Sequence, residues 1–177
     1  MKKTVFFLFS LITISFLTSC KKDDAKPETP KTQVPDAFVG KWEVGNFNMS
    51  NFFTYDGSSP YIAGNDAVAY SISKDGNAEQ FIYYQFDDGS KKQVLAHRKG
   101  TVTYDENTKT LKFCPREGSF RTFINRNKTE DTYGNEDLYP KYAPQYRNCY
   151  FETDNQRTYL IGTSDRNETL AFRKVNW

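Results

Sequence analysis

Two runs of β-forming residues joined by a tight turn constrain the fold of this chain more than any other feature. The run AVAYSIS at 67–73 alternates between apolar and polar residues, and the run EQFIYYQF follows at 79–86. Between them stands Lys74-Asp75-Gly76-Asn77, and an Asp-Gly pair in this position is a strong signal for a β-hairpin. We therefore expect antiparallel strands in this region.

Similar short runs with turn residues between them continue to the end of the chain. Further strands are expected near 94–104, 110–113, 119–124, 157–163 and 168–175, and Lys99-Gly100 inside the first of these indicates a bulge. With a first strand near Gly40, the pattern predicts eight strands in an antiparallel sandwich or barrel. Two long insertions, 50–65 and 125–148, interrupt the pattern, and loops of this length are usually functional lids or mobile segments.

The N-terminus has the proportions of a secretory signal. Lys2 and Lys3 precede an uncharged apolar run at 4–17, which is too short to span a bilayer. The run ends in Leu17-Thr18-Ser19-Cys20, which resembles the bacterial lipobox. That resemblance implies a signal peptide over 1–19, cleavage before Cys20 and acyl chains on Cys20 that anchor the protein stably. The alternative is an uncleaved membrane anchor with an incidental cysteine.

The residues behind Cys20 indicate a location and a tether. Lys22, Asp23 and Asp24 resemble the export signal of certain Gram-negative surface lipoproteins, which implies an outer-membrane protein that faces the cell exterior. The alternative is a solvated charge run on a protein that faces the periplasm. The stretch 20–35 contains three prolines among polar residues, so we expect a flexible tether that reaches roughly 45 Å.

The folded part, 36–177, is one domain by its length. Without Lys2 and Lys3 the 24 basic residues fall to 22, which equals the 22 acidic ones. Nucleic-acid binding needs a basic excess, so it is excluded as a function class. Cys114 and Cys149 remain once Cys20 is assigned to the anchor, and outside the cytoplasm they favour a disulfide, with two buried free thiols as the alternative.

Two short motifs at the ends of the domain carry a family resemblance. Gly40-Lys41-Trp42 on the first strand and Arg173 on the last resemble the lipocalin and calycin superfamily. The resemblance implies an all-β, antiparallel, up-and-down eight-stranded barrel whose one end Trp42 closes. It further implies that Arg173 lies across the Trp42 ring, where cation–π attraction is worth about 0.5–2 kcal/mol. Gly40 would let the backbone pack against the ring. The alternative is an ordinary core tryptophan in another β-barrel.

The sequence contains little that points to catalysis. His97 is the one histidine, no serine stands in G-x-S-x-G, and no cysteine or histidine pair has zinc spacing. The acidic stretch 129–137 does not match the calcium-loop pattern. We therefore expect a protein that is not an enzyme and that uses no cofactor and no metal.

Aromatic residues form the one pattern that indicates binding. Crowding is strongest in the first insertion and on the strand 79–86, and the ligand-binding candidates are Phe52, Phe53, Tyr55, Tyr61, Tyr83 and Tyr84. Further tyrosines occur in and directly after the second insertion, at 139, 142, 146 and 150. In a lipocalin-like barrel the loop after the first strand would cover the open mouth. Core packing is an equally good explanation of these rings.

Two functions follow from this reading. The first is a surface lipoprotein whose barrel binds a small hydrophobic ligand or a glycan fragment, with outer-membrane lipid as a partner through Cys20. The alternative is a non-catalytic accessory lipoprotein docked on an outer-membrane complex for uptake, secretion or assembly. A ligand binder needs a cavity of a few hundred Å³, whereas a docking protein needs a large exposed apolar patch.

Overall fold

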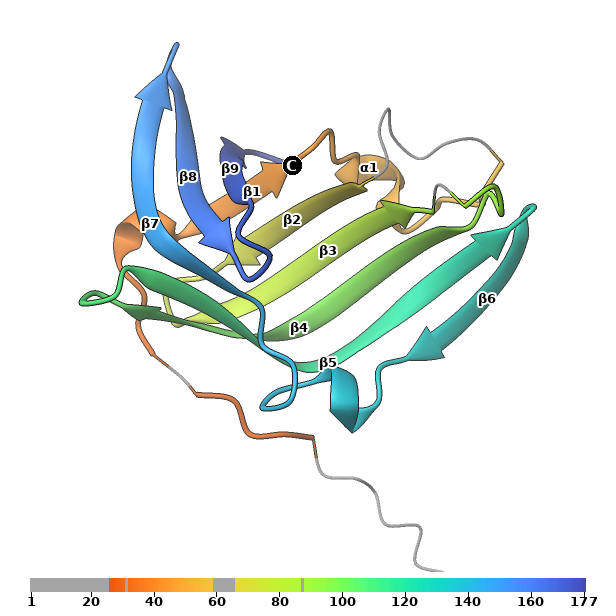
Figure 1. Cartoon of the computed structure of the whole chain (residues 1–177), viewed down its shortest axis with the longest axis horizontal. Helices are drawn as coiled ribbons and strands as arrows, with labels where there is room; N and C mark the ends of the chain where they lie inside the picture. Colours follow the sequence, from red (N-terminus) through yellow and green to blue (C-terminus); the bar gives the residue numbers. More distant parts are fainter. Residues whose placement is uncertain (1–25, 31, 59–65, 87) are drawn as a thin grey trace, which may run out of the picture.

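The computed structural model describes residues 26–30, 32–58, 66–86 and 88–177 (Figure 1). The predicted sites at Cys20, Lys22, Asp23, Asp24 and Tyr61 lie outside these residues. In the described part the elements run in the order η1 (Asp36–Phe38), β1 (Gly40–Val44), α1 (Met49–Phe52), β2 (Asp66–Ile72), β3 (Asn77–Gln85), β4 (Gln93–Asp105), β5 (Thr110–Ile124), β6 (Asn127–Thr132), η2 (Asn135–Asp137), β7 (Gln145–Asp154), β8 (Arg157–Ser164) and β9 (Thr169–Val175).

The nine described strands form one antiparallel sheet that closes on itself in a ring. The strand order is β4-β3-β2-β1-β9-β8-β7-β5-β6, and a further pairing of β4 with β5 closes it. β6 pairs only with β5, so it lies outside the ring. The prediction of an all-β antiparallel fold is confirmed, and so is the predicted pairing of the first strand with the last, in which Glu43 lies opposite Arg173.

The strand count and several strand boundaries differ from the prediction of eight. The expected strands at 110–113 and 119–124 are one long strand, β5, and the insertion at 125–148 holds β6 and the start of β7. β6 reads NKTEDT and is exposed throughout, so no apolar alternation marks it as a strand. The bulge predicted at Lys99-Gly100 is confirmed, because the register of β4 on β5 shifts there.

The β2–β3 hairpin forms where the Asp-Gly pair predicts it. Ile72 pairs with Ala78 across the turn, and Gly76 takes the left-handed conformation with φ 79°. Its backbone N–H donates to the carbonyl of Ser73 at 3.0 Å, while Asp75 accepts a hydrogen bond from the backbone N–H of Asn77 at 3.3 Å. A glycine suits this position because a side chain disfavours positive φ.

The two faces of the strands bury two separate clusters. One cluster fills the ring interior with Trp42, Tyr70, Val102, Phe113 and Phe172, and Val34 and Phe38 join it. The other occupies the opposite face of β2 to β5 and contains Ala69, Phe81, Tyr83, Leu95 and Phe123, with Phe47 and Phe52 packed on it from the α1 segment. Alternation along each strand separates the two sets, because successive side chains point to opposite faces.

Trp42 does not contact Arg173, the predicted partner, but another residue of β9. Trp42 is 1% exposed and donates its indole N–H to the carbonyl of Phe38 at 2.8 Å. Its partner across β9 is Lys174, whose Nζ lies 5.2 Å from the ring centre. Arg173 points to the other face and forms an ion pair with the buried Glu43. The register of β1 on β9 decides this, since it places Lys174 and not Arg173 opposite Trp42. Gly40 leaves room for the same lysine, because a Cβ there would lie 3.1 Å from Lys174 Cε.

The described residues before β1 belong to the folded body, so the predicted tether over 20–35 is too long. Thr101 donates its hydroxyl to the carbonyl of Pro30 at 2.7 Å, and Thr32 donates to the carbonyl of Val102 at 3.2 Å. Val34 is buried in the ring cluster, and Lys26 forms an ion pair with Glu117. The body therefore begins by Lys26 in the described chain.

The predicted disulfide between Cys114 and Cys149 is not formed. Both cysteines are free and buried, which is the alternative that the sequence left open. Cys149 shares the interior cluster with Phe113, whereas Cys114 follows Phe113 in β5 and points to the opposite face. The sheet therefore separates the two thiols.

Candidate functional site

The segment between β6 and β7 crosses the concave face of β4 and β5 (Figure 1). The backbone N–H of Tyr139 donates to the carbonyl of Pro115 at 2.8 Å, and that of Phe113 donates to the carbonyl of Pro144 at 2.9 Å. These bonds satisfy part of β5 that neither β6 nor β7 pairs with. The segment therefore occupies the place over the open end of the ring that the sequence analysis gave to the first insertion.

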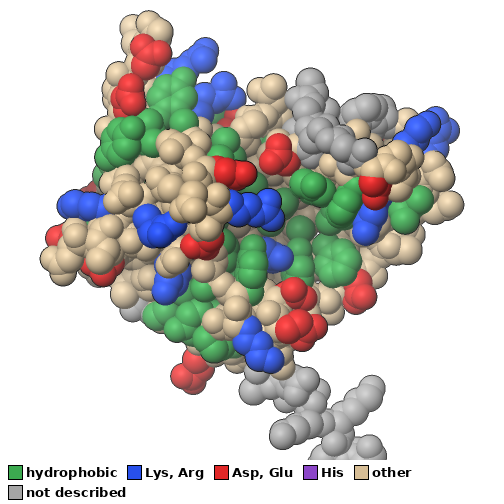
Figure 2. Space-filling model, viewed as in Figure 1, with side chains coloured by type: hydrophobic (Ala, Val, Ile, Leu, Met, Phe, Trp, Pro, Cys, Tyr) green, Lys and Arg blue, Asp and Glu red, His purple; other side chains and the backbone are tan. Residues whose placement is uncertain are grey.

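A cavity of about 670 Å³ lies between this segment and the ring. We call it the mouth cavity. Apolar side chains of Val44, Val68, Ile82 and Leu170 line it together with Tyr84, Tyr142 and Tyr146, and the polar lining includes Asp66, Gln80, Gln145, Asp165, Arg166 and Glu168. In Figure 2 the middle of this face is hollowed, and hydrophobic side chains stand there among charged ones.

Hydrogen bonds connect a row of side chains beneath the mouth cavity. Arg98 Nη1 donates to Gln80 Oε1 at 3.3 Å, Gln80 Nε2 donates to the hydroxyl of Tyr70, and the hydroxyls of Tyr70 and Tyr146 lie 3.0 Å apart. Burial raises the pKa of Tyr70 well above its ordinary value and that of Tyr146 to about 12. Both hydroxyls are therefore neutral near pH 7 and keep their capacity to donate.

Arg98 is the most unusual member of this row. It is 7% exposed, and its guanidinium lies between two tyrosine rings, 4.1 Å from the centre of Tyr133 and 4.5 Å from that of Tyr142. Its Nε has no hydrogen-bond partner among the described residues. Stacking on aromatic faces partly compensates a buried guanidinium. Arg98 thus holds the segment 133–142 against the ring.

The predicted ligand-binding residues separate into two groups. Tyr83 and Tyr84 belong to the wall of the mouth cavity, where the side chain of Tyr84 is 43% exposed. The side chain of Tyr83 is buried in the cluster on the opposite face of the sheet. Phe52, Phe53 and Tyr55 lie on the α1 segment, which covers the opposite face of the sheet. Phe52 is buried there, Phe53 is 63% exposed, and burial raises the pKa of Tyr55 to about 12. These three do not reach the mouth cavity.

Gln80, Tyr142 and Tyr146 were not among the predicted binding residues. The one signal for the two tyrosines was the tyrosine-rich composition of the second insertion, and Gln80 had none. The contact of that insertion with β4 depends on the stacking of Tyr142 on Arg98, which lies 44 positions earlier in the chain.

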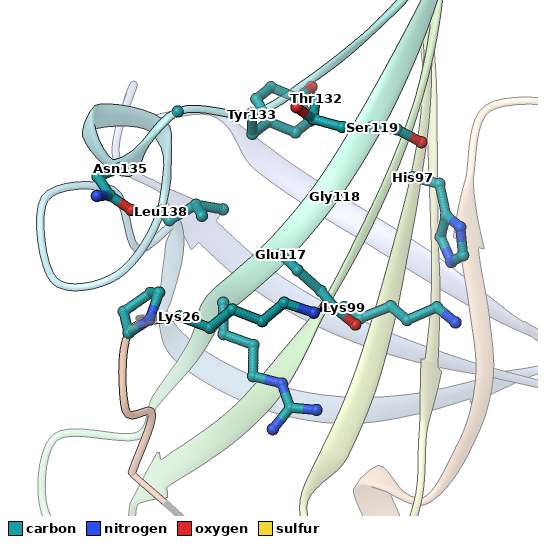
Figure 3. Close-up of a pocket in the computed structure, with 13 residues that line it drawn as sticks. Lys26, His97, Lys99, Glu117, Gly118, Ser119, Thr132, Tyr133, Asn135 and Leu138 are labelled. Atoms are coloured by element: carbon teal, nitrogen blue, oxygen red, sulfur yellow. Dashed lines mark hydrogen bonds and ion pairs between the residues drawn. The ribbon is translucent and has the colours of Figure 1, made fainter. Parts of the chain in front are cut away.

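A second cavity, of about 500 Å³, lies near the start of the described chain (Figure 3). We call it the basic cavity. Lys26, Lys99 and Arg116 line it with Glu117, and Gly118, Ser119, Tyr133 and Leu138 are also part of its wall. Hydrogen bonding to Lys26 lowers the pKa of Glu117, and the charges of Lys26, Arg116 and Lys99 lower it further. Glu117 is therefore ionised among three cations.

His97 lies at the edge of the basic cavity, on the face away from the ring interior. Its Nε2 lies 2.6 Å from Glu79 Oε2, and its ring stacks on Phe81 with 4.6 Å between centres. Ser119 is its cross-strand neighbour on β5. Among the described residues no hydrogen bond joins Ser119 to His97, so the pair lacks the bond through which a catalytic triad activates its serine.

The part of the chain that the structure describes contains no group of three His, Cys, Asp or Glu side chains suited to a metal ion. Within the same residues, no helix has both the length and the apolar character that crossing a bilayer requires. Comparison of the chain with protein-family models, with curated proteins and with solved structures gives no match.

Proposed function

We propose that the protein is a non-catalytic surface lipoprotein whose mouth cavity binds a small ligand, and that the ligand is a glycan fragment. The observation that carries this proposal is the cavity itself, about 670 Å³ at the open end of a closed sheet. Cavities of a few hundred Å³ are the usual size of small-molecule sites. A lipocalin-like barrel is part of this proposal. It is supported by the ring of eight strands, in which the first strand, β1, pairs with the last, β9.

The lining favours a glycan over a wholly apolar ligand. Tyr84 and Tyr142 belong to the lining, and aromatic side chains suit the apolar side of a sugar ring. Gln80, Gln145 and Asp165 supply donors and acceptors beside them. Deeper in the ring, Tyr70 contacts both Phe113 and Phe172 edge to face, so aromatic packing fills the space that a long apolar chain would need.

A matched set of variants tests the binding site. Tyr142→Ala removes a ring from the cavity, and Tyr150→Ala removes a 54% exposed tyrosine from β7 as its control. On an array of bacterial glycans we expect retention of the parent chain, unchanged retention of Tyr150→Ala and weaker retention of Tyr142→Ala. The loss of one aromatic contact should lower affinity about 2- to 12-fold. If Tyr142→Ala binds glycans as well as the parent does, the glycan does not bind in the mouth cavity. If the parent retains a fluorescent fatty acid and no glycan, the ligand is apolar and is not a glycan.

The anchor is the second part of the proposal, and its support is the sequence Leu17-Thr18-Ser19-Cys20 followed by Lys22-Asp23-Asp24. Cells fed a palmitate analogue should label the parent protein and not Cys20→Ala. Asp23→Ala with Asp24→Ala should keep the label but lose cleavage by protease added to whole cells. Persistent label in Cys20→Ala contradicts the anchor, and equal cleavage of the Asp variant contradicts the export signal.

Docking on an outer-membrane complex remains the second candidate. It would require a large exposed apolar patch. The most exposed large hydrophobic residues of the described chain are Phe53 beside α1, Tyr150 on β7, Tyr84 on β3 and Ile124 at the end of β5, so they occur on separate elements. The cavity therefore favours ligand binding.

A further inference from the structure

Three cations and one carboxylate belong to the lining of the basic cavity. The cations are Lys26, Lys99 and Arg116, and the carboxylate is Glu117. The hydrogen bond to Lys26 occupies that carboxylate, which leaves Lys99 and Arg116 without an ion pair in the described chain. Glu136 lies against Gly134 at the rim, and Glu79, which contacts His97, lies opposite Lys99 on β3. These carboxylates and Glu117 equal the three cations of the lining in number, so the positive excess comes from Arg98.

A further cation lies behind the wall of this cavity. Arg98 stacks on the ring of Tyr133, which lines the basic cavity, and its Cγ would lie 2.9 Å from a Cβ at Gly118, which also lines it. The Nε of Arg98 has no partner among the described residues. A buried charge without a counter-charge is costly, so an anion in the cavity would be favoured by Arg98 as well as by the three cations of the lining.

The position of the cavity along the chain places it beside the proposed lipid anchor. Cys20 precedes Lys26 by six positions, and six residues span about 20 Å at most when fully extended. Lys26 is held to the body by Glu117, and Figure 3 shows both side chains at the cavity. None of the described residues before Val44 lines the mouth cavity. Of these two cavities, the basic one is tied to the anchor by the shorter stretch of chain.

We propose that the basic cavity binds the phosphate of an anionic lipid headgroup in the leaflet that holds Cys20. This inference rests on the lipid anchor in the proposed function. The guanidinium of Arg116 offers paired donors that match phosphate oxygens, and Lys99 adds a point charge. Tethering keeps the headgroups at an effective concentration near the millimolar range, so a weak site is occupied. Two attachments, the acyl chains and this cavity, would then orient the body on the membrane.

The test uses the lipidated protein in nanodiscs of phosphatidylcholine, with and without phosphatidylglycerol, at low salt. Brief treatment with an amine-reactive reagent and peptide mass spectrometry give a labelling rate for each lysine. With phosphatidylglycerol present, the rate at Lys99 should fall about fivefold, the factor that corresponds to about 1 kcal/mol per cation near an anionic surface. High salt should restore the rate. Lys91, exposed in the turn before β4, is the reference within the same molecule.

Arg116→Gln removes one cation from the cavity and leaves Lys99 as the probe, so the fall at Lys99 should shrink. Arg157→Gln removes the same charge from the start of β8, at the top of Figure 1 and away from η2 and β6, and should change nothing. Equal labelling of Lys99 on both nanodiscs, with the protein still bound to them, would overturn the proposal. If inorganic phosphate protects Lys99 equally well on nanodiscs of phosphatidylcholine alone, the ligand is free phosphate and not a lipid headgroup.

The intact mass separates failure of this proposal from failure of the anchor. A chain that carries acyl groups on Cys20 and shows no lipid-dependent protection rejects the headgroup site alone. A chain without acyl groups rejects the anchor, and the headgroup proposal with it.

Discussion

The ammonium group of Lys174 lies 5.2 Å from the ring centre of Trp42, and the two residues face each other across the β1–β9 pair that closes the sheet. Because Trp42 is fully buried, Trp42→Ala should lower the free energy of unfolding by about 3–5 kcal/mol. Lys174→Ala should cost about 0.5–2 kcal/mol through the lost cation–π contact. In a double-mutant cycle by urea denaturation, the two losses should not add.

Arg173→Ala is the control for that cycle. Arg173 pairs with Glu43 on the opposite face, so its loss should add to that of Trp42→Ala. Coupling of Trp42 to Arg173 in place of Lys174 would contradict the observed register of β9 on β1.

Tyr70→Phe tests the hydrogen bonds beneath the mouth cavity. The change leaves the amide of Gln80 and the hydroxyl of Tyr146 without their shared partner in the ring interior. A buried group that loses its partner costs about 1–3 kcal/mol, so the urea midpoint should fall accordingly. Tyr150→Phe, at an exposed tyrosine, should stay within about 0.5 kcal/mol of the parent. Equal midpoints for Tyr70→Phe and the parent would show that these bonds contribute nothing.

Alkaline pH should destabilise the fold through Tyr146. Burial raises its pKa to about 12 from an ordinary value of 10.0, so the folded state binds this proton more tightly than the unfolded chain. The resulting stability is complete below pH 10 and is lost as the pH rises from 10 toward 12, by about 3 kcal/mol. Burial of Tyr70 acts in the same direction. Urea midpoints across this range measure the loss, and Tyr146→Phe should flatten the curve. A parent midpoint that stays constant from pH 9 to 12 would contradict the assignment.

Cys114 and Cys149 should resist alkylation in the native protein. Both thiols are buried, and burial raises the pKa of each, which lowers the fraction of reactive thiolate. Iodoacetamide without reductant should therefore add little mass to the native chain and two alkyl groups to the urea-unfolded chain. If the unfolded chain takes up two alkyl groups only after reduction, the cysteines form a disulfide, and the assignment of free thiols is wrong.

Local sequence determined the parts of the fold that depend on neighbouring residues. The Asp75-Gly76 turn and the bulge at Lys99-Gly100 form where they were predicted, because each depends on backbone preferences within a few residues. The strands β2 and β3 were equally clear, since apolar residues alternate in β2 and β-forming aromatic residues crowd β3. β6 was missed because its residues are all polar and exposed, so pairing with β5 and not side-chain burial makes it a strand.

The candidate sites depended on contacts that no local pattern records. Tyr142 reaches the mouth cavity because it stacks on Arg98, and Lys26 reaches the basic cavity because it pairs with Glu117, 91 positions later. Phe52 and Tyr55 were predicted near the mouth from their aromatic character, but the α1 segment packs on the other face. Hydrophobicity marks a residue for burial and does not say which side of a closed sheet will bury it.

By itself the sequence determined an antiparallel β-domain with its hairpin turns, and it contains the Leu17-to-Cys20 motif on which the proposed anchor rests. Only the tertiary structure decided which cation meets Trp42, which face holds each cysteine, and which loop lies over the ring. The physical reason is register: in a strand of period two, a shift of one residue exchanges the two faces. Register between β1 and β9 is set by contacts of residues about 130 positions apart, such as Glu43 with Arg173.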